Sequence, residues 1–185
     1  MSSTSNTPVA GMPFEENGIW VNFPDTNYFQ FQDIPEYKSI SSQSIREMDF
    51  GWFDNANDTM FLIELKAYHN PSNPHHQPTN LADSSIRDTK LQELYEKSVH
   101  SVSMLYSTRS PVRPILPAAH LETEKLRLIH ILNIPNALHP YLSIMQDVLR
   151  NRLKPYKAIF DINSIVIIDY TTACNKFTWA GNPNH

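Results

Sequence analysis

Two carboxylates and one ammonium group lie near one another in the sequence, at Asp49, Glu64 and Lys66. Their neighbours are mostly large apolar residues, and burying charge there costs free energy unless the charges satisfy one another or hold a cation. Mg²⁺ prefers oxygen ligands, typically one or two carboxylates together with water and substrate phosphate. A cation held in this way polarises a phosphate group, and a nearby lysine can orient the attacking water. The three residues therefore indicate a site for phosphoryl chemistry.

The elements that would position this trio form a β-hairpin. Residues 45–54 and 59–68 are rich in aromatic and aliphatic residues and predict two strands, and the Asp- and Asn-rich stretch between them predicts a turn. Because side chains alternate along a strand, Glu64 and Lys66 should share one face, and Asp49 can meet them from the neighbouring strand. In the alternative interpretation, Glu64 and Lys66 pair on a solvated strand face and Asp49 closes a turn.

The rest of the chain alternates between helices and strands. Residue types and spacing predict strand structure within 18–32, a helix at 86–107, a strand at 125–134, a helix at 136–154 that ends before Pro155, and a strand at 164–172. Three strands followed by helix, strand, helix and strand (β-β-β-α-β-α-β) imply an α/β fold with a mixed central sheet flanked by helices.

Composition narrows the class of protein. The chain has 185 residues, of which 41% are hydrophobic and 18% charged, as in a globular domain. We expect a flexible N-terminal arm at 1–13, one domain at 14–185 and an exposed loop at 69–81. The single Cys174 excludes an internal disulfide, and the few glycines form no phosphate-binding motif. Because no apolar stretch reaches the roughly 20 residues of a membrane helix, we expect a cytoplasmic protein without membrane association.

Charge is distributed unevenly along the chain, whose formal net charge is −4. Residues 1–65 carry two basic and ten acidic side chains, whereas residues 66–185 carry thirteen basic and nine acidic ones. Four of the basic side chains gather at the end of the last predicted helix, namely Arg150, Arg152, Lys154 and Lys157. They have two interpretations: cations that complement the helix dipole, or an edge that binds the phosphates of a nucleic acid.

Residues and element order together resemble the PD-(D/E)xK nuclease superfamily, whose fold is restriction-endonuclease-like. The resemblance spans about residues 15–172 and rests on Met48-Asp49-Phe50 at the head of the hairpin and Ile63-Glu64-Leu65-Lys66 on its second arm. It implies that Asp49 and Glu64 bind Mg²⁺ or Mn²⁺, that the Leu65 carbonyl is a further ligand, and that Lys66 positions the nucleophilic water.

Many members of the superfamily add a glutamate from an initial helix. Glu15 or Glu16 lies in about that place, but Gly18 follows closely and argues against a helix there. The fourth acidic residue of the site is therefore left unassigned.

The resemblance implies a metal-dependent nuclease that hydrolyses phosphodiester bonds, with DNA as the expected substrate and RNA as the alternative. In a chain of this size, specificity is expected from a homodimer or from a partner protein in a larger complex. The rival interpretation is a catalytically inactive member of the fold that serves as an interaction module. Net acidity favours the module, and the complete Asp49, Glu64 and Lys66 trio favours the nuclease.

Overall fold

The computed structural model describes residues 11, 13–16, 18–40, 42, 44–69, 79–107 and 124–181. Its centre is a five-stranded sheet in the order β3-β4-β5-β6-β7. The strands are β3 (Tyr28–Gln30), β4 (Phe50–Asp54), β5 (Thr59–Ala67), β6 (Lys125–Asn133) and β7 (Ile162–Asp169). Neighbours among β3, β4 and β5 are antiparallel, and those among β5, β6 and β7 are parallel. The predicted mixed sheet is confirmed.

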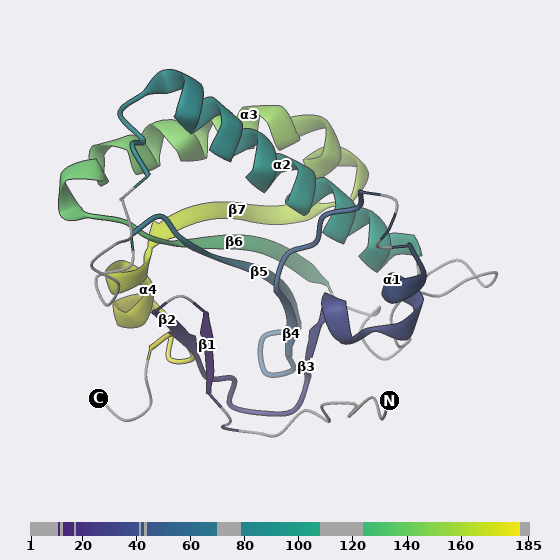
Figure 1. Cartoon of the computed structure of the whole chain (residues 1–185). Coiled ribbons are helices and arrows are strands. Elements are labelled where there is room, and N and C mark those ends of the chain that lie inside the picture. The colour runs from purple at the N-terminus through teal and green to yellow at the C-terminus, as the bar shows by residue number, and fades with distance from the viewer. Residues whose placement is uncertain are drawn as a thin grey trace.

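Helices flank this sheet on both sides. One face is covered by α2 (Ser84–Ser107) and α3 (Pro140–Ile159), which pack against each other above the strands in Figure 1. On the opposite side lie a small hairpin, β1 (Phe14–Glu16) and β2 (Ile19–Val21), and α4 (Tyr170–Lys176). The short α1 (Pro35–Ile40) connects β3 to β4. Apart from α1, the order of elements from β3 to β7 is the predicted one, so the α/β class is confirmed.

The central strand β5 lies between two hydrophobic cores. Residues 59–65 are all buried, because both faces of the strand are covered. Met60 and Leu62 belong to the core beneath α2 and α3, whereas Ile63 and Leu65 belong to the core on the opposite face. This alternation turns Glu64 toward α2, so the predicted orientation of Glu64 and Lys66 on one strand face is confirmed.

The second predicted strand is shorter than expected. Residues 45–48 are not strand, and β4 begins only at Phe50. The Arg46 N–H donates to His100 Nδ1 at 3.0 Å, and the Met48 N–H donates to Ser101 Oγ at 2.8 Å. Side chains of α2 thus take the hydrogen bonds that a neighbouring strand would otherwise have made, and Asp49 lies directly before β4 rather than within it.

Both limits of the helix predicted at 136–154 were wrong. α3 continues through Pro155 to Ile159 instead of ending before the proline. A proline costs one helical hydrogen bond, but Tyr156 and Phe160 beyond it stack with ring centroids 6.3 Å apart and pack against the helix-side core. The helix also begins later than the predicted residue 136, at Pro140, because a 3₁₀ turn (Asn136–Leu138) precedes it.

The last strand ends at Asp169 rather than at 172. The carboxylate of Asp169 accepts a hydrogen bond from the Thr172 N–H at 2.9 Å and caps the N-terminus of α4. The cap also lowers the pKa of Asp169, although burial acts in the opposite direction. Asp169 therefore has a structural role in starting α4.

Two further predictions fall mainly on residues outside the described ranges. Of the predicted arm at 1–13, only Gly11 and Pro13 are described, and the loop predicted at 69–81 is described only at its two ends. None of the helices in the described ranges is long and apolar enough to span a membrane.

Candidate functional site

Asp49 closes the end of the β4–β5 ladder. The last paired residues of the two strands are Phe50 and Ile63, so the N–H of Leu65 extends beyond the partner strand. The Asp49 carboxylate takes the place of that partner and accepts a hydrogen bond from the Leu65 N–H at 2.6 Å. This bond fixes one oxygen of Asp49 and leaves the other, Oδ1, facing the helix side of the sheet.

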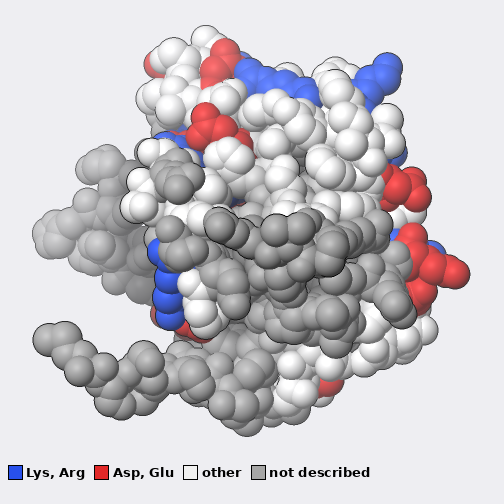
Figure 2. All heavy atoms as spheres, turned by 90° about the vertical axis from the view of Figure 1, so that its right-hand side faces the viewer, with Lys and Arg blue, Asp and Glu red and all other residues white. Residues whose placement is uncertain are grey.

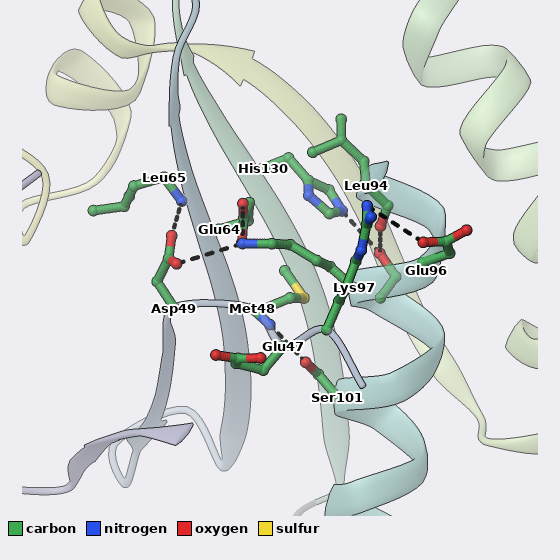
Figure 3. A network of polar contacts seen from close by, with 12 residues as sticks. Glu47, Met48, Asp49, Glu64, Leu65, Leu94, Glu96, Lys97, Ser101 and His130 are labelled. Atoms are coloured by element: carbon green, nitrogen blue, oxygen red, sulfur yellow. Dashed lines mark hydrogen bonds and ion pairs between the residues drawn. The ribbon is translucent and has the colours of Figure 1, made fainter. Parts of the chain in front are cut away.

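Glu64 lies on β5 and is fully buried. Both of its carboxylate oxygens accept hydrogen bonds from Lys97 Nζ, at 2.7 and 2.9 Å. The same Nζ lies 3.7 Å from Asp49 Oδ1. Figure 3 shows the Lys97 side chain reaching from α2 to the strands and ending between the two carboxylates. Asp49 and Glu64 therefore contact one shared cationic group.

Lys97 is the residue of this cluster that sequence reasoning missed. It lies on α2 between Leu94 and Ser101, both buried, and so occupies the inward-facing stripe of the helix. A lysine is ordinarily solvated, and nothing in residues near position 97 indicates an acid 33 positions earlier in the chain. The available signal was the lysine's position at helical spacing within a buried stripe, which calls for an acidic partner across the interface.

Burial dominates the electrostatics of the two carboxylates. It raises the pKa of Asp49 against the opposing effects of Lys97 and the Leu65 N–H. It raises the pKa of Glu64 well above the ordinary value, and the neighbouring Asp49 adds to the increase. Burial lowers the pKa of Lys97, but Glu64 and Asp49 together outweigh it, so the net change is upward. The ammonium group therefore offsets the cost of burying the two carboxylates only in part.

Lys66 lies on the same strand face as Glu64, two residues closer to the end of β5, and is half-buried. Its charge lowers the pKa of both Asp49 and Glu64. Within the described residues it makes no hydrogen bond or ion pair. The carbonyl of Leu65 points to the same side of the strand as the Leu65 N–H, since both groups of one residue face the same neighbour. That side is where Asp49 lies.

A pocket of about 200 Å³ opens the cluster to solvent on the β3 side of the sheet. It is lined by Glu16, Gln30, Gln32, Glu47, Asp49 and Phe50. Glu16 is exposed at its rim; partial desolvation and the nearby Asp49 raise its pKa. Glu15 instead accepts a hydrogen bond from the Gly18 N–H within the hairpin. Of the two glutamates considered from sequence, Glu16 is the one beside Asp49, and it comes from a β-hairpin rather than from a helix.

Behind Glu64 the polar contacts continue into the core. His130, the partner of Glu64 on β6, is fully buried, and its Nε2 lies 3.1 Å from Ser98 Oγ. Ser98 Oγ donates to the Leu94 carbonyl, so His130 Nε2 is the donor and Nδ1 the acceptor. Nδ1 has no hydrogen-bond partner among the described residues. Burial, assisted by Lys97, lowers the pKa of His130 to about 3, so the ring is neutral and Lys97 carries the charge of this layer.

The donor set fits a Mg²⁺ or Mn²⁺ ion with few protein ligands. The described residues contain no group of three or more His, Cys, Asp or Glu side chains placed to hold a metal. They do place two carboxylates, Asp49 and Glu64, around one cationic group, with the Leu65 carbonyl on the Asp49 side. One or two carboxylates completed by water and substrate phosphate are the usual Mg²⁺ environment, so the residues present are compatible with such an ion.

The basic residues at the end of α3 lie apart from this cluster. Arg150, Lys154 and Lys157 line a pocket of about 350 Å³ beside β7, the far edge strand of the sheet. The guanidinium of Arg150 is anchored there, since its Nε donates to the Ile165 carbonyl at 2.9 Å. Arg152 is not part of this pocket; it donates to Gln92 Oε1 at 3.2 Å.

A basic pocket thus exists at the β7 edge, but it is lined by three of the four predicted residues, and β5 and β6 lie between it and the strand that follows Asp49. On the face shown in Figure 2, Lys and Arg lie next to Asp and Glu, and the described residues form no continuous basic surface there.

Comparison with known proteins gave no match to a family model, to a curated protein or to a solved structure. The candidate site rests on the geometry and charge of its own residues.

Proposed function

We propose that this protein is a Mg²⁺- or Mn²⁺-dependent nuclease of the PD-(D/E)xK type, which hydrolyses phosphodiester bonds in DNA. The observation that carries the proposal is the placement of the Asp49 and Glu64 carboxylates on either side of one ammonium group, 3.7 and 2.7 Å from its nitrogen. Two acids, one directly before β4 and one on β5, converge on one cationic group and surround a space suited to a small cation. The carbonyl of Leu65, on the Asp49 side, would be a third protein ligand.

The residues around this position have distinct parts in the reaction. The bound ion would polarise the scissile phosphate and stabilise the charge that develops on its oxygens. Lys66 lies on the same face as Glu64 without a partner among the described residues, so its ammonium group can orient the water that attacks phosphorus while the bond to the leaving oxygen breaks. Asp49 is held in place by the Leu65 N–H, which supports a preorganised site.

Substrate binding is expected to draw on basic surface elsewhere. The pocket lined by Arg150, Lys154 and Lys157 offers cations to a phosphate backbone, and its lining includes no acidic side chain. Because this pocket lies beside β7, with β5 and β6 between it and the strand that follows Asp49, it would hold a segment distant from the scissile bond. A homodimer or a partner protein would then supply the remaining specificity.

The proposal is tested by incubating the purified protein with DNA, and separately with RNA, in the presence of Mg²⁺. Glu64→Gln removes one anionic ligand and should abolish cleavage, whereas the exposed Glu124→Gln carries the same chemical change away from the site and should leave it intact. Lys66→Ala should reduce turnover by roughly 10²-fold or more while metal still binds, since it removes a group that acts on water and not a ligand. Full activity in Glu64→Gln would overturn the assignment.

One observation favours a second candidate, a catalytically inactive interaction module. Lys97 already satisfies Glu64 with two hydrogen bonds, which is how a purely structural ion pair would look. In that case neither DNA nor RNA would be cut under any metal condition, and Mg²⁺ or Mn²⁺ would leave the melting temperature unchanged.

A further inference from the structure

Lys97 occupies the space between the two acids on which the proposed metal site depends. Its Nζ lies within hydrogen-bonding distance of both Glu64 oxygens, at 2.7 and 2.9 Å, and 3.7 Å from Asp49 Oδ1. A Mg²⁺ ion held by the same oxygens would need ligand distances of about 2.0–2.1 Å. The ammonium group and the ion would then lie within a few ångströms of each other in a largely buried setting, where like charges repel strongly. Both cannot occupy this position.

We infer that Lys97 is an exchangeable counter-cation, which neutralises Asp49 and Glu64 in the metal-free protein and leaves them when a divalent cation binds. The inference rests on the proposed metal site and describes how that site is kept folded and how it is loaded. Without a cation, a fully buried Glu64 would be strongly destabilising, and Lys97 removes that cost.

The surroundings of Lys97 permit such an exchange. Its side chain is 20% exposed, whereas that of Glu64 is completely buried, so the lysine is the partner with access to solvent. Lysine also carries its charge on a flexible four-carbon chain. Glu47, whose negative charge contributes to the raised pKa of Lys97, lines the pocket that leads outward from Asp49. The ammonium group can therefore turn from Glu64 toward the pocket and still find an acidic neighbour there.

The direct test is a titration with Mn²⁺ alone, read from the melting temperature and from the free Mn²⁺ signal in electron paramagnetic resonance. Lys97→Met keeps the length of the side chain and removes its charge. The matched control is Lys90→Met on the same helix, because Lys90 pairs with Glu93 at 2.8 Å and does not contact the site. Lys97→Met should melt lower without metal but bind Mn²⁺ at least about tenfold more tightly than wild type, since one adjacent opposite charge changes carboxylate affinity for a proton by about 10- to 1,000-fold.

A purely structural role for Lys97 predicts the reverse, because a loosened site would bind Mn²⁺ more weakly. If wild type and Lys90→Met bind Mn²⁺ and Lys97→Met binds equally or less tightly, the exchange is refuted while the proposed metal site stands. If Lys97→Met binds and wild type does not, Lys97 is a fixed counter-ion that keeps the cation out, and both the exchange and the proposed metal-dependent activity fall. If no variant binds Mn²⁺, both fall.

A second measurement uses the wild-type chain and does not depend on the variant folding. Acetylation of lysines, followed by mass spectrometry, should find Lys97 protected in EDTA and modified severalfold faster with saturating Mn²⁺, whereas Lys90 should react equally in both. If Mn²⁺ raises the melting temperature while Lys97 stays protected, the ion binds without displacing the lysine and the inference is overturned.

Discussion

The two faces of β5 differ in the residues that they bury. On the face toward α4 and the β1–β2 hairpin, Ile63 and Leu65 belong to an entirely apolar core that includes Trp52 and Trp179. On the face toward α2, the next residue along the strand, Glu64, is buried with a lysine, and a neutral histidine lies beside it on β6. One face of β5 thus packs into an apolar core that stabilises the fold. The other face holds buried charge, which costs free energy.

This difference indicates where function is to be sought in the molecule. An apolar core stabilises a fold by burial, and replacing one apolar group by another of similar size changes little. A buried ion pair is often no more stabilising than apolar residues of the same volume, so its presence calls for another reason. The reason proposed here is that Glu64 holds a metal and that Lys97 neutralises Glu64 until the metal binds.

The largest effect is expected on the apolar face. Trp179 is 4% exposed and its ring lies 5.9 Å from those of both Phe23 and Trp52. Trp179→Ala should lower the free energy of unfolding by about 3–5 kcal/mol, the usual cost of truncating a large buried side chain. Urea denaturation measures this cost. The Mn²⁺ affinity of the folded protein should not change, and a matching loss of affinity would show that the two faces are coupled.

On the polar face, the expected costs are asymmetric. Lys97→Met leaves Glu64 buried without a partner among the described residues and should cost roughly 3 kcal/mol. Glu64→Met should cost less, because Lys97 keeps Asp49 and some solvent. The double variant should be more stable than Lys97→Met alone, since it buries no unpaired charge. A double-mutant cycle in urea with EDTA measures the coupling, and strictly additive costs would mean that the ion pair contributes nothing.

His130 should make stability depend on pH with a predictable sign. The unfolded chain binds a proton at this residue below about pH 6.5, whereas the folded protein keeps the ring neutral until about pH 3. Stability from this source is therefore lost as pH falls below 6.5. Between pH 7 and pH 5, wild type should lose about 2 kcal/mol more than His130→Gln, which still offers a donor to Ser98. Equal losses, measured with EDTA present, would contradict the buried neutral histidine.

The smallest change in stability is expected from Lys66→Met. Lys66 is half-buried and has no ion pair with a described residue, so its free energy of unfolding should stay within about 0.5 kcal/mol of wild type. The contrast with Lys97→Met separates the two lysines: one compensates buried charge, and the other is free to act on water. A loss as large as that of Lys97→Met would show that Lys66 also compensates buried charge.

Much of the fold was predictable because apolar periodicity is a local property. The helix predicted at 86–107 begins only two residues earlier, and β5 and β6 each end within one residue of their predicted limits. The β1 strand was missed, since its three residues are too few to show a period. The start of β4 was predicted too early. The Met48 N–H donates to Ser101, which lies 53 positions later in the chain, and no local pattern reveals that contact.

In the candidate site, the positions of residues on the hairpin were predictable from local pattern, and contacts from other elements were not. Strand alternation placed Glu64 and Lys66 on one face and brought Asp49 to their side, which needs only the hairpin. Lys97 was not found, and Glu16 was considered but left unassigned, because each reaches the cluster from an element whose packing no local pattern reveals. Of the basic residues at 150–157, three line one pocket, whereas Arg152 donates to Gln92 on α2. Their part in nucleic-acid binding stays a prediction.

The most direct measurement of the central claim is a crystal structure of the wild-type protein soaked in Mn²⁺, with anomalous diffraction locating the ion. We expect one anomalous peak between the carboxylates of Asp49 and Glu64, in contact with both, and a Lys97 side chain turned away from Glu64. Crystals that show no peak at millimolar Mn²⁺, with Lys97 Nζ still bonded to both Glu64 oxygens, would contradict it.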